Sequence, residues 1–265
     1  MNNTKKYIII SNELTLFCKY DDETKNEISQ LIVSENISKL IFKNNISISI
    51  NDLPNNIEQL VIHTNISSGI LNNLPSSIKQ LYLANYSKDL YNLCRNLKVI
   101  SLGNEFNRPV DNLPNSLEEI FFGNKFNQNV NFLPSSIKTI KFGNEFNKNV
   151  DDLPSQIERI IFGENFNCPI DNLPWTIIYI SFDWTSNFDQ PIYKLPNNLQ
   201  ELYFGNNFNN IICKLPNGLK KILLGSSFAK PIILPNKLEK IKLSSKYKFI
   251  DTIKNILSPT IIELY

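Results

Sequence analysis

The residues that decide the fold are LPNSLEEIFFGNKFNQNVNF, from Leu113 to Phe132, followed at once by LPSSIKTIKFGNEFNKNVDD, from Leu133 to Asp152. The two segments share one pattern of twenty residues, although most of their polar residues differ. Leucine and proline occupy positions 1 and 2, glycine occupies position 11, and a Phe-Asn pair occupies positions 14 and 15. The chain is therefore a repeat array, and degenerate copies can be followed from Val33 onward.

The length and pattern of this repeat predict its fold. A period near twenty residues is too short for a helical hairpin and lies at the low end of the leucine-rich-repeat range. Apolar residues at positions 8 and 10 alternate with variable residues at 7 and 9, as in a strand with one buried face. Proline, which lacks an N–H, belongs in the corner before the strand, and glycine is expected to supply a positive φ after it. We predict a right-handed β-solenoid of leucine-rich-repeat type, with a parallel β-sheet on one face and little α-helix.

The repeats define the expected domain organisation, which is one elongated domain. Residues 1–32 do not fit the pattern and are expected to form an N-terminal cap of two strands and a short helix. Residues 33–256 hold about eleven repeats, and residues 257–265 are a terminal partial repeat. The copy that begins at Leu173 is two residues longer than the period of twenty, and it contains both tryptophans, Trp175 and Trp184.

Composition excludes several classes of function. A net charge of +2, with 20% charged residues, gives no strong field toward nucleic acid or an anionic membrane. The four cysteines share no repeat position, so neither a disulfide framework nor a zinc site is expected. The apolar run near the start is too short for a signal peptide, and no apolar span reaches membrane-spanning length. We expect a cytoplasmic protein that holds no metal and no cofactor.

The Phe-Asn pair of each repeat is interpreted as structural. The phenylalanine is expected to stack coil upon coil in the core, and the asparagine amide is expected to be buried and to bond turn backbone in its own coil and the next. These ladder residues are Phe106, Phe126, Phe146, Phe166, Phe208, Asn107, Asn127, Asn147, Asn167 and Asn209.

The consensus LPxxLxxLxFGxxFNxxI, with the segments FNQNV, FNKNV, FNCPI and FDQPI, resembles the FNIP repeat. This repeat is a relative of the leucine-rich repeat found in social amoebae and in giant DNA viruses. Family members often carry an F-box before the repeats, which makes them candidate substrate receptors of ubiquitin ligases. The first 32 residues are too few for an F-box, and they lack its Leu-Pro helical pattern.

Signals for catalysis are nearly absent from the sequence. His63 is the only histidine, and no cysteine or serine stands at a related repeat position where it could be activated. Carboxylates occupy variable or loop positions, and each glycine is isolated, so there is no phosphate-binding loop. We therefore do not expect an enzyme.

The outward face of the strands is the predicted binding surface. Position 9 is more apolar than a solvated face requires, and position 7 beside it is polar and mixed, a combination typical of interaction surfaces. The competing explanation is that β-propensity favours such residues on any strand. The predicted partner-binding residues are Tyr82, Phe121, Lys141, Ile161, Tyr179, Glu201, Tyr203 and Leu223.

The function favoured by the sequence is a non-enzymatic scaffold that binds a protein, a host protein in host cytoplasm if the chain is viral. One alternative is a substrate-recognition subunit linked to ubiquitin ligation without an F-box. Another is an acidic or nucleic-acid partner bound by the lysine-rich repeats from Leu215 to Ile256, although nucleic acid is disfavoured because arginine is missing there. A homodimer through the C-terminal edge strand is a further expectation.

Overall fold

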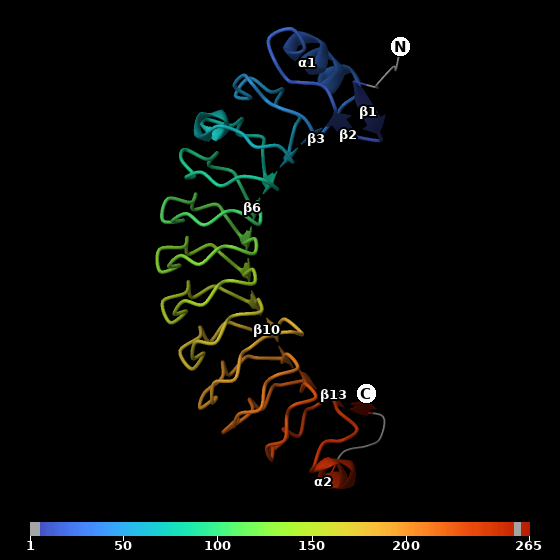
Figure 1. The fold of residues 1–265 in the computed structure, drawn as a ribbon, viewed down its shortest axis with the longest axis vertical. Helices are drawn as coiled ribbons and strands as arrows, with labels where there is room; N and C mark the ends of the chain where they lie inside the picture. The colour runs from blue at the N-terminus through green and yellow to red at the C-terminus, as the bar shows by residue number, and fades with distance from the viewer. Residues whose placement is uncertain (1–5, 257–260) are drawn as a thin grey trace. The chain divides into compact units, whose positions relative to one another are not determined.

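The computed structural model describes residues 6–256 and 261–265, and the chain divides into two compact units, Met1–Gly123 and Asn124–Tyr265. In each unit, successive coils contribute one short strand each, and the strands pair in sequence order (Figure 1). The predicted β-solenoid of leucine-rich-repeat type, with a parallel sheet and little helix, is confirmed in both units. The division into an N-terminal cap, repeats and a partial repeat stays a prediction, and residues 257–260 lie outside the described residues.

The first unit begins with an antiparallel hairpin of β1 and β2, and every later pair of its strands is parallel. The two strands and the helix that its first residues predict are β1, β2 and α1. Its elements are β1 (Tyr7–Ile10), β2 (Glu13–Leu16), α1 (Lys25–Ser34), β3 (Lys39–Phe42), β4 (Gln59–Ile62), a 3₁₀ turn (Ser68–Leu71), β5 (Gln80–Leu83), β6 (Val99–Leu102) and β7 (Glu119–Phe121).

The second unit continues with parallel strands, and a short helix lies between its last two strands in the chain. Its elements are β8 (Thr139–Lys141), β9 (Arg159–Phe162), β10 (Tyr179–Phe182), β11 (Glu201–Tyr203), β12 (Lys221–Leu223), β13 (Lys240–Leu243), α2 (Ile250–Ile256) and β14 (Ile262–Leu264). No helix among the described residues is long and apolar enough to span a membrane.

Burial alternates along the strands as the sequence predicts. In β5, Leu81 and Leu83 are buried while Gln80 and Tyr82 are half-buried, and β10 repeats this pattern. Side chains of successive strand residues point to opposite faces of a sheet, so positions 8 and 10 face the core. Ile41 in β3 departs from the pattern, because this position 9 side chain is only 8% exposed.

The core of the second unit is a double row of phenylalanine rings. Rings at position 14 stack on their equivalents in neighbouring coils, as Phe146 does on Phe166 with centroids 6.0 Å apart. Rings at position 10 lie against them within the same coil, as Phe142 does on Phe146 at 3.7 Å. All these rings are buried, and each coil makes aromatic contacts with both of its neighbours. A single coil could not bury this aromatic surface alone.

Proline at position 2 opens the turn that precedes the strand. Its carbonyl oxygen accepts a hydrogen bond from the N–H of position 5, for example from Leu117 to Pro114 at 3.0 Å. The missing proline N–H costs nothing in this corner, because no ladder bond is needed there. Cys94 replaces proline in one coil, and its carbonyl accepts the same bond from Leu97 at 3.3 Å.

Glycine occurs at position 11 for a different reason than the sequence predicted. No glycine among the described residues has a positive φ, so the prediction of a left-handed conformation after the strand was wrong. A Cβ at Gly163 would instead lie closer than 3.0 Å to the backbone of Gly143 in the preceding coil, and Gly123 meets Gly103 in the same way. Glycine at these positions lets successive coils touch backbone to backbone, whereas Ala84 and Asp183 occupy position 11 in two other coils.

Candidate functional site

The outward face of β9 to β12 gathers the strongest set of interacting side chains in the second unit. The parallel register places Arg159 beside Tyr179, Tyr179 beside Glu201, and Glu201 beside Lys221. Tyr203, two residues after Glu201, points to the same face. We call these five residues the tyrosine array.

The aromatic rings of the array are held by contacts between strands. The guanidinium carbon of Arg159 lies 3.8 Å from the centroid of the Tyr179 ring, within the range of a cation–π interaction. The rings of Tyr179 and Tyr203 are 5.5 Å apart and tilted by 46°. Arg159 is exposed, whereas both tyrosines are half-buried, so part of each tyrosine residue remains exposed to solvent.

Glu201 fixes the other end of the array. Its carboxylate accepts a hydrogen bond from the Tyr203 hydroxyl at 2.7 Å and another from the Lys221 ammonium at 3.0 Å. Partial burial opposes ionisation, but these two bonds and the nearby positive charges outweigh it, so the pKa of Glu201 is lowered. Burial and the Glu201 carboxylate together raise the pKa of Tyr203, which therefore remains a neutral hydroxyl that donates to Glu201.

The remaining predicted residues of this unit flank the array. Ile161 on β9 and Leu223 on β12 are half-buried at position 9, and they extend the apolar part of the array. Lys141 in β8 is exposed. Ser181 lies between Ile161 and Tyr203 in the position 9 column, so the smallest side chain of this column in the second unit stands at the centre of the array.

The outward face of the first unit carries a smaller hydrogen-bonded group around Gln80. The Tyr82 hydroxyl donates to Gln80 at 3.2 Å, and Gln59 donates to the same oxygen at 2.9 Å. Tyr82 and Val61 line a shallow depression of about 440 Å³ beside them. Phe121 is half-buried in β7. This face has no array comparable to that of the second unit among the described residues.

His63 lines the same depression. Partial burial and the nearby Lys43 lower its pKa, so the imidazole is neutral near pH 7. The side chain of Asn85 donates a hydrogen bond to its backbone carbonyl. Within residues 6–256 and 261–265, no group of three or more His, Cys, Asp or Glu side chains could hold a metal ion.

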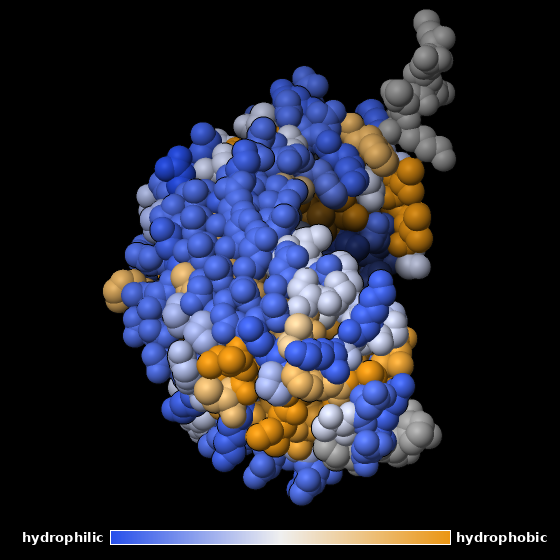
Figure 2. Space-filling model, turned by 60° about the horizontal axis from the view of Figure 1, so that its bottom comes forward, coloured by the Kyte–Doolittle hydropathy of each residue, from blue (hydrophilic) through white to orange (hydrophobic). Residues whose placement is uncertain are grey.

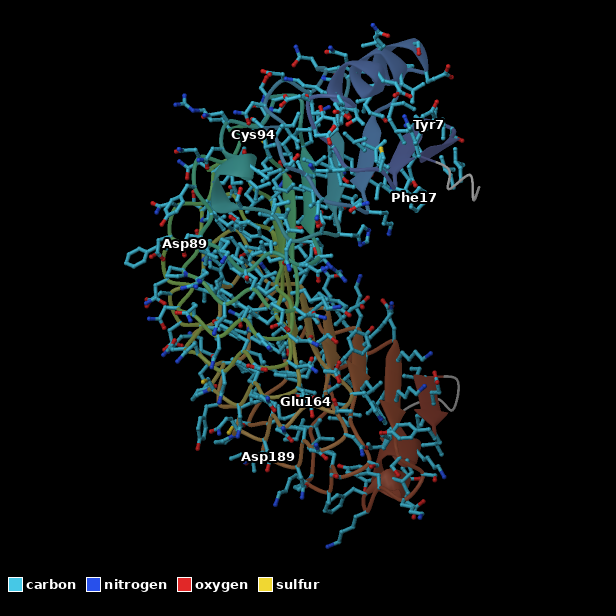
Figure 3. The ribbon with its side chains drawn as sticks, turned by 45° about the horizontal axis from the view of Figure 1, so that its top comes forward. Tyr7, Phe17, Asp89, Cys94, Glu164 and Asp189 are labelled. Carbon is cyan, nitrogen blue, oxygen red and sulfur yellow. The ribbon has the colours of Figure 1, made fainter. Side chains whose placement is uncertain are left out.

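The asparagines that follow the phenylalanines form a ladder on the loop side of the second unit. The side-chain oxygen of Asn127 accepts the backbone N–H of Asn147 at 3.0 Å, and Asn147 accepts that of Asn167 at 3.0 Å. Asp189, which lies on the loop side of the strands (Figure 3), replaces asparagine in the next coil, and its carboxylate accepts the N–H of Asn209 at 2.8 Å.

This ladder differs from the sequence interpretation in one respect. Asn147 and Asn167 are exposed and Asn127 and Asn209 are half-buried, so the expectation of a buried amide was wrong. Exposure is tolerated because only the side-chain oxygen is needed by the next coil, while the NH₂ group can face water. Asn107 occupies the same position in the first unit and is also exposed, while Phe106 stacks on Tyr86 at 6.5 Å.

The lysine-rich C-terminal region is partly neutralised. Lys240 and Lys242 both bind the Glu263 carboxylate of β14, at 2.5 and 2.7 Å, and these bonds lower the pKa of Glu263 to about 2. Two of the lysines that suggested an acidic partner are thus already paired. Whether β14 forms a homodimer contact stays a prediction.

Apolar surface on the second unit is not restricted to the array. The space-filling view shows apolar patches separated by hydrophilic residues (Figure 2). The large exposed apolar residues of this unit are Phe132, Trp175, Trp184, Tyr193, Ile211, Ile233, Leu264 and Tyr265.

Two members of the tyrosine array, Arg159 and Lys221, are absent from the predicted binding residues. The signal that could have found them is the repeat period, which places equivalent residues of consecutive coils side by side. Arg159, Tyr179, Glu201 and Lys221 share position 7, so their adjacency follows from the alignment of the coils. What the sequence could not show is that Arg159 stacks on the Tyr179 ring.

Comparison with known proteins identifies the repeat. The family described as FNIP Repeat matches residues 92–125 and 146–183, so the chain contains FNIP repeats in these two segments. No curated protein matches the chain. Among solved structures, "The crystal structure of CroV588 a novel circular LRR protein structure" is similar, with 24% identity and a TM-score of 0.49. The match covers 98% of this chain and 54% of that chain, so this chain spans about half the length of that protein.

Proposed function

Starting from a solenoid that contains FNIP repeats, we propose that the chain is a non-enzymatic scaffold that binds a protein partner through the tyrosine array. The observation that carries the proposal is the fixed pair of half-buried tyrosines on the outward sheet face. Tyrosine and arginine are enriched among the residues that dominate binding energy in protein interfaces.

Pre-organisation of the array supports a binding role. Ordering flexible side chains at an interface costs about 0.5–1.5 kcal/mol for each one immobilised. Tyr203 is already held by Glu201, and Tyr179 is already covered by Arg159, so binding would lose little further side-chain entropy.

The charges of the array indicate the chemistry of the partner. The Glu201 carboxylate is satisfied by Tyr203 and Lys221, whereas Arg159 makes no ion pair with any described residue. An apolar segment with a carboxylate placed opposite Arg159 would fit this surface, because arginine binds carboxylates with charge-assisted bonds. The competing explanation is that the array only stabilises the sheet through cross-strand pairs.

A photo-crosslinking amino acid at Ser181 tests the proposal at the centre of the array. Illumination of native cells that express this variant should yield a discrete crosslinked protein. The same amino acid at Phe132, which is 71% exposed and lies outside the strands, is the matched control and should not capture it. Tyr179→Ser combined with Tyr203→Ser should abolish the crosslink from Ser181 while the protein remains folded. A crosslink that survives both substitutions would refute binding through the array.

A further inference from the structure

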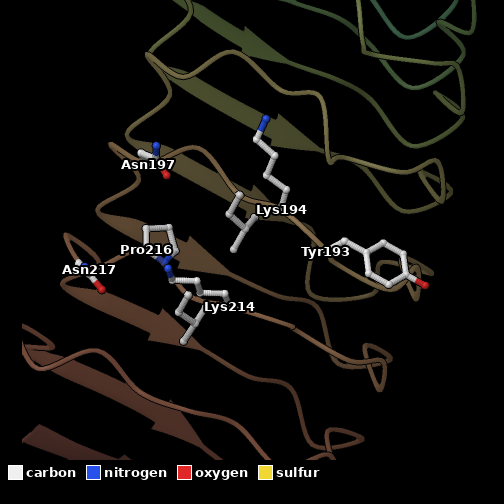
Figure 4. Close-up of a pocket in the computed structure, with 8 residues that line it drawn as sticks. Tyr193, Lys194, Asn197, Lys214, Pro216 and Asn217 are labelled. Atoms are coloured by element: carbon white, nitrogen blue, oxygen red, sulfur yellow. The ribbon is translucent and has the colours of Figure 1, made fainter.

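A depression of about 410 Å³ lies between two consecutive corners of the second unit (Figure 4). Both corners have the same sequence, Lys-Leu-Pro-Asn, at residues 194–197 and 214–217. Tyr193 completes the lining. The two lysines are exposed, and neither makes an ion pair with a described residue. The depression is therefore polar and positively charged.

The chain takes a different path through these two corners than through the coil before them. In that coil, Asp171 and Asn172 form a turn before the proline corner. The next two coils have no turn there, and Ile192 and Ile212 instead form a parallel bridge. The turn bonds the Leu173 N–H to Ile170 of the same coil, whereas at the bridge the N–H groups of Ile192 and Cys213 bond carbonyls of the neighbouring coil.

Asp171 shows how the chain satisfies such amide groups. One oxygen of its carboxylate accepts the backbone N–H of Tyr193 at 2.9 Å and that of Lys194 at 2.8 Å. One coil later, Tyr193 stands at the position equivalent to Asp171, and it supplies no carboxylate. The N–H of Lys214, which lines the depression, donates to no acceptor among the described residues. The second corner thus lacks the carboxylate oxygen that the first one has.

We propose that this depression binds a carboxylate group, which takes the place that the Asp171 carboxylate has one coil earlier. The ligand oxygen accepts the Lys214 N–H, and the Lys214 ammonium supplies positive charge beside it. The exposed Lys194 side chain points toward the preceding strand, and it adds its charge when it turns toward the ligand (Figure 4). Bonds from ammonium groups to a carboxylate are shorter and about twice as strong as neutral ones. Asn197 and Asn217 on the rim add amide donors.

The carboxylate could belong to a free organic acid or to an acidic side chain of a polypeptide, and the recognition chemistry is the same for both. Two probes separate these sources. Acetate presents the carboxylate alone, and N-acetyl-aspartate amide presents it on a peptide backbone. The residues that line this site do not belong to the tyrosine array. A failure of this proposal would therefore leave the proposed scaffold function unaffected, and the reverse is also true.

Titration of the isotope-labelled full chain with each probe, followed by amide NMR, tests the proposal. The Lys214 amide resonance should shift in a saturable manner, because its N–H gains an acceptor. Sodium chloride at the same ionic strength should leave the Lys214 amide resonance unshifted. Lys214→Gln should weaken binding at least fivefold, as judged from the shifts of neighbouring amides. A tenfold preference for the aspartate amide would assign the site to a polypeptide, and equal binding would assign it to a free acid.

Tyr193→Asp provides the decisive variant, because it supplies the missing carboxylate from within the chain. The introduced carboxylate should accept the Lys214 N–H and eliminate acetate binding, whereas Tyr193→Ala, which removes the same ring but adds no carboxylate, should still bind acetate. Tyr193 is exposed, so both variants should fold, and their amide spectra verify this directly. The proposal is overturned if the Lys214 amide does not respond to either probe, or if Tyr193→Asp binds acetate as well as Tyr193→Ala does.

Discussion

The ring of Tyr265 packs edge-on against the indole of Trp184, with ring centroids 5.8 Å apart. Trp184 belongs to the longer loop that follows β10, and Tyr265 follows β14. The Tyr265 hydroxyl also donates to the Leu224 carbonyl at 2.8 Å. Two departures from the repeat, the lengthened coil and the last strand, therefore contact each other.

This contact should contribute measurably to stability. Tyr265→Phe loses only the hydrogen bond, so the free energy of unfolding should fall by about 1 kcal/mol. Tyr265→Leu also loses the aromatic contact, and the fall should reach about 2 kcal/mol. Denaturant unfolding measures both changes. In a Trp175→Phe background, Tyr265→Leu should shift the fluorescence emission of Trp184, and an unchanged spectrum would contradict the contact.

The backbone contact at position 11 predicts a sharp difference between two glycines. Gly163→Ala places a Cβ against the Gly143 backbone, which cannot move aside as a side chain could, so we expect a loss above about 3 kcal/mol. The nearest atom to a Cβ at Gly218 is 3.9 Å away, and Gly218→Ala should be neutral or stabilise by up to about 1 kcal/mol. Thermal unfolding of the two variants compares them. Equal losses would mean that the coils are not in close backbone contact.

The side-chain oxygen at position 15 should matter more than the amide. Asn147→Ala removes the acceptor of the Asn167 N–H and should cost about 1 kcal/mol in denaturant unfolding. Asn147→Asp keeps an oxygen there, as Asp189 does naturally, and should stay within about 0.5 kcal/mol of the wild type at pH 7. If both substitutions cost the same, the ladder depends on the NH₂ group instead.

Glu201 should make stability depend on pH. Its pKa is lower in the folded protein than in the unfolded chain, so the unfolded state binds more protons and stability rises with pH in this range. The contribution is fully present above the unfolded pKa of about 4.3, and it is lost as the pH falls through the lower folded value. Unfolding of the wild type and Glu201→Gln between pH 7 and pH 2.5 tests this. The wild type should lose more stability than Glu201→Gln, and parallel profiles would exclude the effect.

The repeat pattern predicted the parts of the structure that every coil shares. Strand positions, the buried faces and the proline corners follow from residues that recur with period twenty, because each coil must present the same contacts to its neighbours. Properties that depend on distances between backbones were not predictable. Gly163 illustrates this, since a sequence shows that glycine recurs but not whether φ or close contact requires it.

Residues outside the repeat were also hard to interpret. The two-residue insertion marked Trp184 as unusual, yet nothing in the sequence connects it with Tyr265. Likewise, the two Lys-Leu-Pro-Asn segments are plain in the sequence, but their open corner depends on a turn that is absent there. The tyrosine array was predictable only in part. The repeat period places its members on one face of the sheet, but the stacking of Arg159 on Tyr179 depends on side-chain rotamers.

The asparagine ladder joins each coil to its neighbour through an N–H that every residue except proline possesses. The side-chain oxygen of Asn147 would therefore accept this bond whichever residue stood at position 15 of the following coil, as Asn209 does with Ala229 at 2.9 Å. Neighbouring coils thus need no matched pair of side chains at this position. Whole coils of this kind can be duplicated, deleted or exchanged by recombination without a compensating substitution in the ladder, which allows such arrays to change length while their outward faces diversify.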